Sequence, residues 1–190
     1  MGRRDGENRL FTTAACRFFI AGGPSPERER HMNNLKTGAL TRAAIIAALY
    51  AALTLLLAPI SYGEVQIRIS ESLTLLPVLL PEAVPALAVG CLIANVLGGC
   101  TIFDIVFGTL ATLLAAAAVR RLRAHLRLAM AMPVFFNALI VGAVVHYAYA
   151  PVMPLPLCML FVAVGETVSC VILAPMVLSM LRRLPGELME

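Results

Sequence analysis

The stretch that decides the fold lies near the carboxyl end of the chain, PLCMLFVAVGETVSCVILAPMVLSML at residues 156–181. It carries a single charged residue, Glu166, and it is long enough to cross a bilayer as a helix, because a spanning helix needs about 20 mostly apolar residues. An ionisable group near the centre of such a helix costs about 2.5 kcal/mol or more, so it seldom occurs without a function. Glu166 is therefore a candidate binding residue.

The composition of the whole chain agrees with a membrane protein. Of its 190 residues, 60% are hydrophobic and only 14% are charged, which leaves too little polar surface to cover a soluble globule. We therefore predict an all-α integral membrane protein. The five cysteines form no CxxC pair and no Cys/His spacing typical of a metal site, so we expect neither a disulfide framework nor a metal centre.

Six apolar segments predict six transmembrane helices, at about 39–58, 68–80, 82–98, 103–119, 130–149 and 155–181. Pro77, Pro81 and Pro85 fall four residues apart and remove backbone donors from any continuous helix. We expect a kink near Pro77 and a break at Pro81, with Pro81 at the first position of the next helix.

Orientation follows from the positions of lysine and arginine. Six spans bring three basic clusters to one side, at residues 36–42, 120–127 and 182–183, and the positive-inside tendency then makes both termini cytoplasmic. Residues 38–183 form the predicted membrane domain, and residues 184–190 form a short cytoplasmic tail. Residues 1–37 are rich in charge and proline and predict a disordered tail, with Met32 as an alternative true start.

Several polar residues lie inside or at the ends of these helices. In the predicted orientation most of them lie near the outer face, with Glu166 near the midplane and Asn137 slightly inside it, so the helices converge on a pocket open to the outside. The candidate binding residues are Arg68, Glu71, Asn95, Asp104, Asn137 and Glu166. With one positive and three negative groups, the set carries a net charge of −2 if all are ionised. Such a site favours a cation or a ligand rich in hydrogen-bond donors, such as the edge of a guanine-type base, and the alternative is a proton or metal-cation site.

Each of these residues also has a structural interpretation. Asp104 follows Thr101 by three residues, which is the spacing of a helix capping box. Arg68 and Glu71, three apart, could simply pair with each other, and the two asparagines could join helices by hydrogen bonds. Glu166 could be protonated or paired with a neighbouring helix. The hypothesis of a binding site therefore rests on the joint placement of these residues.

The first helix carries small residues at helical spacing. Alanines at 43, 47 and 51, and again at 44, 48 and 52, form two ridges that let another helix approach closely. We consider internal packing and docking of a separate membrane subunit, and for docking we single out Ala43, Ala47 and Ala51.

Three motifs in order resemble the QueT family. They are APISYGEVQIRISESLTLLP at 58–77, GCLIANVLGG at 90–99 and DIVFGTLATLLAA at 104–116. The resemblance implies a six-helix substrate-binding S-component of an energy-coupling factor (ECF) transporter in a bacterial cell membrane. It further implies capture of a 7-deazaguanine queuosine precursor (preQ1, preQ0 or queuine) from outside. The implied partners are a transmembrane coupling subunit and two cytoplasmic ATPases. Residues 1–31 have no counterpart in this pattern.

Other functions remain open at this point. The chain has no Walker-type phosphate-binding loop, so it does not hydrolyse ATP itself. A stand-alone secondary transporter would use Glu166 or Asp104 as a proton carrier, and an S-component for another vitamin is also possible. An enzyme is disfavoured because the three histidines are scattered and no nucleophile–base pair stands out. We expect no cofactor and no nucleic-acid partner.

Overall fold

The computed structural model describes residues 26–58, 68–181 and 183, with side chains from Lys36 onward. The chain divides into two units, Met1–Gly38 and Ala39–Glu190, and the packing and side-chain contacts described below lie in the second. The described residues are helical in six segments, and the predicted all-α fold is confirmed.

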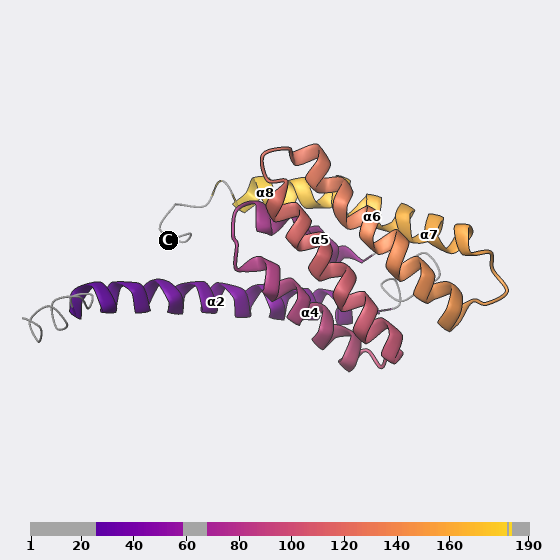
Figure 1. The fold of residues 1–190 in the computed structure, drawn as a ribbon, viewed down its shortest axis with the longest axis horizontal. Helices are drawn as coiled ribbons and strands as arrows, with labels where there is room; N and C mark the ends of the chain where they lie inside the picture. Colours follow the sequence, from indigo (N-terminus) through magenta and orange to yellow (C-terminus); the bar gives the residue numbers. More distant parts are fainter. Residues whose placement is uncertain (1–25, 59–67, 182, 184–190) are drawn as a thin grey trace, which may run out of the picture. The chain divides into compact units, whose positions relative to one another are not determined.

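These segments follow the predicted ranges closely. The first is α2 (Pro26–Leu56), the second is the 3-10 helix η1 (Ile69–Val78), and the third is α4 (Ala83–Leu97). The fourth joins the π-helical turn η2 (Asp104–Gly108) to α5 (Thr109–Arg121), and the fifth joins α6 (Leu126–Val144) to the π-helical turn η3 (Val145–Tyr149). The sixth comprises α7 (Leu155–Thr167), the π-helical turn η4 (Val168–Leu173) and α8 (Ala174–Leu181). Along the chain α4, α5, α6 and α7 each pack against the next (Figure 1).

The start of the first helix differs from the expectation. Helix α2 begins at Pro26, so residues 26–37, which we expected in the disordered tail, have helical backbone. The rest of that tail and residues 184–190 lie outside the described residues. The proposed start at Met32 and the cytoplasmic placement of both termini stay predictions.

The outside of the second unit is apolar. Three helical stretches are long and apolar enough to cross a membrane, Lys36–Leu56, Leu126–Tyr149 and Leu155–Leu181. Large apolar side chains lie exposed along them, among them Leu40 at 70% and Met180 at 69% of their surface. Such a surface is stable in contact with lipid tails, and it marks the chain as a membrane protein.

The short helix η1 lies at the centre of the fold. It contacts α4, α5, α6, η4 and α8, and every residue from Ser70 to Pro77 is buried. A 3-10 helix has three residues per turn, so residues three apart lie in one column. One column holds Glu71 and Thr74, and a second holds Leu73 and Leu76. Glu71 and Thr74 therefore lie on a different side of this buried helix from Leu73 and Leu76.

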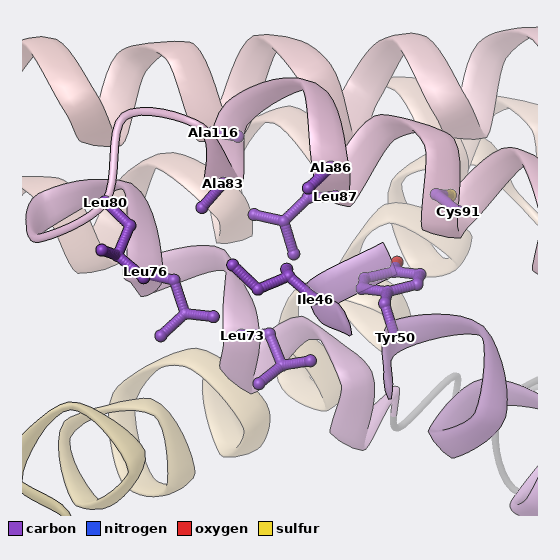
Figure 2. Packing of buried hydrophobic residues seen from close by; sticks show 10 residues of the cluster. All are labelled: Ile46, Tyr50, Leu73, Leu76, Leu80, Ala83, Ala86, Leu87, Cys91 and Ala116. Atoms are coloured by element: carbon purple, nitrogen blue, oxygen red, sulfur yellow. The ribbon is translucent and has the colours of Figure 1, made fainter. Parts of the chain in front are cut away.

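The column of Leu73 and Leu76 packs into the largest apolar cluster (Figure 2). This cluster joins α2, η1, α4 and α5 through Ile46, Tyr50, Leu73, Leu76, Leu80, Ala83, Ala86, Leu87, Cys91 and Ala116. It fixes α2 against the two elements that follow it in sequence.

The break at the prolines occurs as expected, with one shift. Helix η1 ends at Val78 and α4 begins at Ala83, two residues after the predicted start at Pro81. Proline has no N–H, so Pro81 cannot donate to the carbonyl of Pro77 as a helical residue would. Arg120 Nη1 donates to that carbonyl instead, at 3.1 Å, and it lies 3.4 Å from the carbonyl of Val78. Arg120, one of the basic residues from which the membrane orientation was predicted, thus also supplies a donor for the backbone carbonyls at the helix break.

The two alanine ridges of α2 have different environments. Ala47 and Ala51 are each 7% exposed, and a Cβ at Gly90 of α4 would come within 2.8 Å of the carbonyl oxygen of Ala47. Ala43 packs half-buried against the same apolar cluster. The structure therefore uses the ridge that we singled out for docking as internal packing. The exposed ridge is the other one, formed by Ala44, Ala48 and Ala52.

Candidate functional site

Four of the six predicted binding residues come together beside η1. Arg68 lies at the amino-terminal end of η1 and Glu71 in its first turn, while Asn137 comes from α6 and Glu166 from α7. All four side chains are at most 3% exposed. Arg68 interacts electrostatically with both carboxylates, and the two carboxylates repel each other. We call these four residues the central polar cluster.

The hydrogen bonds that the described residues make to the Glu71 carboxylate reach one of its two oxygens. The hydroxyl of Tyr50 on α2 donates a hydrogen bond to Oε1, and Thr112 Oγ1 on α5 lies 3.4 Å from the same oxygen. The other oxygen, Oε2, is buried and makes no hydrogen bond with the described residues. A buried acceptor without a donor costs about 1–3 kcal/mol, so Oε2 is a position where a ligand donor would be stabilising.

Glu166 lies at the end of α7, two residues before the π-helical turn η4. The thiol of Cys170, inside that turn, lies 3.5 Å from Glu166 Oε2 and 3.6 Å from the backbone carbonyl of Glu71. Turns of this kind widen a helix locally and are frequent at functional sites. The turn brings Glu166 and its sulfur neighbour next to η1.

Asn137 lies beside both carboxylates, near enough for its side chain to interact with Glu71 and with Glu166 as a weak hydrogen-bonding group, although neither contact reaches the distance and angle of a regular hydrogen bond. Neither its Oδ1 nor its Nδ2 makes a hydrogen bond with the described residues, although the side chain is only 2% exposed. An amide offers one acceptor and two donors. The central polar cluster therefore contains unused hydrogen-bonding groups of both kinds.

Asn95 and Asp104 form a second group. Asn95 Nδ2 donates to the backbone carbonyl of Asp104 at 3.1 Å. The carboxylate of Asp104 accepts from Thr101 Oγ1 at 3.0 Å and from the hydroxyl of Tyr149, and the Asp104 N–H lies 3.4 Å from Thr101 Oγ1. Of the two hydrogen bonds of a capping box, the structure has the one from the Asp104 N–H to Thr101 Oγ1, whereas the Thr101 N–H donates to the hydroxyl of Tyr149 at 3.3 Å. A binding role for Asn95 and Asp104 stays a prediction.

The charge of the central polar cluster differs from the expectation because Asp104 is bonded elsewhere. One guanidinium against two carboxylates gives a net charge of −1 if all three are ionised, instead of −2. Among the described residues, no group of three or more His, Cys, Asp or Glu side chains is placed to hold a metal ion.

Three neighbours of the binding residues were not predicted from the sequence, namely Tyr50, Thr112 and Cys170. Tyr50 had a detectable signal, because a tyrosine inside an apolar membrane helix carries a hydroxyl that needs a partner when buried, and Tyr50 is fully buried. Thr112 and Cys170 gave no such signal in the sequence. Both are common in membrane helices, where they bond to the backbone of their own helix, as Thr167 does to the carbonyl of Ala163 at 2.7 Å.

Two hollows among the described residues differ in character from the central polar cluster. One, of about 480 Å³, lies between η2 and the α6–η3 segment, and Phe103, Phe107 and Tyr147 contribute to its wall. The other, of about 530 Å³, lies along α6 and α7 beside Phe135 and Met159. No charged side chain lines either hollow, so neither resembles a site for a polar ligand.

Comparison with known proteins gives one family and one curated relative. The family model described as QueT transporter matches residues 40–183. The queuosine precursor transporter QueT of Lactococcus lactis subsp. cremoris (strain MG1363) is 39% identical over 84 residues, which cover 43% of this chain. The match spans about half the length of that relative, 49%. No solved structure matches the chain.

Proposed function

We propose that this chain, which belongs to the QueT transporter family, captures a queuosine precursor of the 7-deazaguanine class inside the membrane. The observation that carries the proposal is the central polar cluster with its unused groups. Glu71 Oε2 and both polar atoms of Asn137 are buried without hydrogen-bond partners among the described residues. A ligand that pairs with them removes a cost of about 1–3 kcal/mol for each group.

The chemistry of a 7-deazaguanine fits this set. Its base edge presents a carbonyl acceptor beside a ring N–H and an exocyclic amine, both donors. A carboxylate accepts such parallel N–H donors well, and the amide of Asn137 can donate to the carbonyl. The net charge of −1 around Arg68, Glu71 and Glu166 also favours a ligand that brings donors or a positive charge.

We infer further that the chain works as the S-component of an ECF-type importer, with both termini in the cytoplasm of a bacterial cell. Two features support this role. The sequence has no phosphate-binding loop, so energy has to come from partners or from an ion gradient. The exposed ridge of Ala44, Ala48 and Ala52 offers a separate membrane subunit the close approach that small residues permit. In this role the protein binds and delivers its ligand and performs no catalysis.

The direct test is ligand binding by the purified protein without partners. Titration calorimetry with preQ1, preQ0 and queuine should show tight binding of at least one, with riboflavin and thiamine as controls. Mass spectrometry of any co-purifying small molecule gives an independent answer. Binding of a control vitamin, and of none of the three deazaguanines, would overturn the substrate assignment.

The coupling role needs a separate experiment. Uptake of labelled preQ1 should require the coupling subunit and an ATPase with an intact phosphate-binding lysine. Ion-driven uptake by this chain alone would instead establish a secondary transporter, with Glu166 as the first candidate for the proton carrier.

A further inference from the structure

Tyr50 occupies a position that the proposed function does not yet explain. Its ring belongs to the apolar cluster between α2, η1 and α4, at the end where Cys91 lies (Figure 2). A Cβ at Gly90 would come within 2.9 Å of the Cβ of Tyr50, so α4 presses closely on this side chain. The ring is therefore held firmly, and its hydroxyl has little freedom to choose another partner.

The hydroxyl is directed at one oxygen of a binding carboxylate. Tyr50 donates to Glu71 Oε1, which also has Thr112 Oγ1 at 3.4 Å, while Oε2 has no partner among the described residues. A second buried bond, from Thr54 Oγ1 to Ser70 Oγ at 2.7 Å, joins α2 to η1 one turn further along α2. The two bonds fix the register of η1 against α2.

We propose that Tyr50 is a positioning residue that holds Glu71 by Oε1 and so presents Oε2 to the ligand. The inference rests on the proposed function and deepens it. A carboxylate that rotates freely has to be ordered when the ligand binds, and that ordering lowers the affinity. Glu71 anchored at one oxygen is already in position.

The test is a double-mutant cycle in binding of preQ1, with Tyr50→Phe and Glu71→Gln. Phenylalanine keeps the ring in the apolar cluster and removes only the hydroxyl. Tyr50→Phe should weaken binding about tenfold, because a hydrogen bond to a charged group is lost. Since Tyr50 acts through Glu71, the double variant should bind no more weakly than Glu71→Gln alone. Thermal unfolding in detergent verifies that each variant is folded.

Two further variants complete the design. Thr112→Val removes the second donor near the same oxygen, and its smaller loss should likewise disappear in the Glu71→Gln background. It also keeps the inference testable if Tyr50→Phe fails to fold. Tyr149→Phe is the matched control, because that tyrosine also donates to a carboxylate, Asp104, and its effect should multiply with that of Glu71→Gln.

The outcomes separate the two proposals. If the wild-type protein binds none of preQ1, preQ0 and queuine, the proposed function and the role of Tyr50 both fail. If the wild type binds preQ1 but Tyr50→Phe binds equally well, or the losses of the two single variants multiply, only the role of Tyr50 is overturned.

Discussion

Adjacent alanines on α2 should respond in opposite ways to the same substitution. Ala47 is buried against α4, whereas Ala48 is exposed. The backbones of α2 and α4 lie so close at Ala47 and Gly90 that a Cβ added to Gly90 would lie 3.1 Å from the Ala47 Cα. The extra carbon atoms of Ala47→Leu would therefore meet the backbone of Gly90. We expect Ala47→Leu to destabilise the fold and Ala48→Leu to leave it intact but block docking of the proposed coupling subunit.

The magnitudes follow from the packing. Overfilling a close contact costs about 1–3 kcal/mol. In a chain of this length 1 kcal/mol shifts the unfolding midpoint by about 2–4 °C, so Ala47→Leu should lower it by roughly 2–12 °C. A leucine at an exposed position of a membrane helix is favourable by about 0.3–0.6 kcal/mol, so Ala48→Leu should shift the midpoint by less than about 2 °C.

Thermal unfolding in detergent and capture of the coupling subunit separate the two effects. Ala48→Leu should melt like the wild type, bind preQ1 with unchanged affinity and fail to retain the coupling subunit. A normal melting curve for Ala47→Leu together with early melting of Ala48→Leu would show that the face of α2 with Ala48, and not the face with Ala47, packs against the protein. Normal capture by folded Ala48→Leu would refute the docking role of the exposed ridge.

The remaining predictions concern the site and the proline break. In Glu71→Gln the amide carbonyl stays with the Tyr50 hydroxyl, so its NH2 faces the donors of the ligand, and preQ1 affinity measured by titration should fall at least tenfold. Glu166→Gln should also lose at least tenfold in affinity in the same assay. The control is Glu82→Gln, which should bind normally because the Glu82 carboxylate pairs with Arg42 at 2.7 Å. Normal affinity in Glu71→Gln or Glu166→Gln would make that residue a packed polar group. Arg120→Met should destabilise the fold by about 1–3 kcal/mol, because it leaves the Pro77 carbonyl without a donor, and an unchanged thermal midpoint would contradict this.

The six helices were predictable because each is an apolar run bounded by charges, glycine or proline. The 3-10 geometry of η1 was not. Ser70 to Pro77 are buried on every side, so polar and apolar residues do not alternate with a period that would distinguish three residues per turn from 3.6. The start of α2 at Pro26 was missed because a charged segment gives no apolar signal for a helix.

The charged members of the site were predictable because a charge inside an apolar run is costly and therefore visible. Glu71 and Glu166 illustrate this. The hydroxyl and thiol neighbours were not, since Thr112 and Cys170 look like ordinary membrane-helix residues. The contacts of Asp104 were not predictable either, because a capping-box residue and a binding carboxylate have the same spacing in sequence. The same holds for the two alanine ridges, which differ by one residue.

The contact faces of α2 also limit how its length can change. Ala47 and Ala48 are neighbours in sequence, yet they face the protein and its surroundings respectively, and Tyr50 lies within one turn of both. Each added or deleted residue rotates everything on one side of the change by about 100° and shifts it by 1.5 Å along the axis. A deletion between Arg42 and Ala47 would therefore turn the end at which Arg42 pairs with Glu82 out of phase with the end at which Tyr50 bonds to Glu71. The number of residues between these two ends is therefore fixed, whereas an exposed side chain such as that of Ala48 can be exchanged without disturbing the fold.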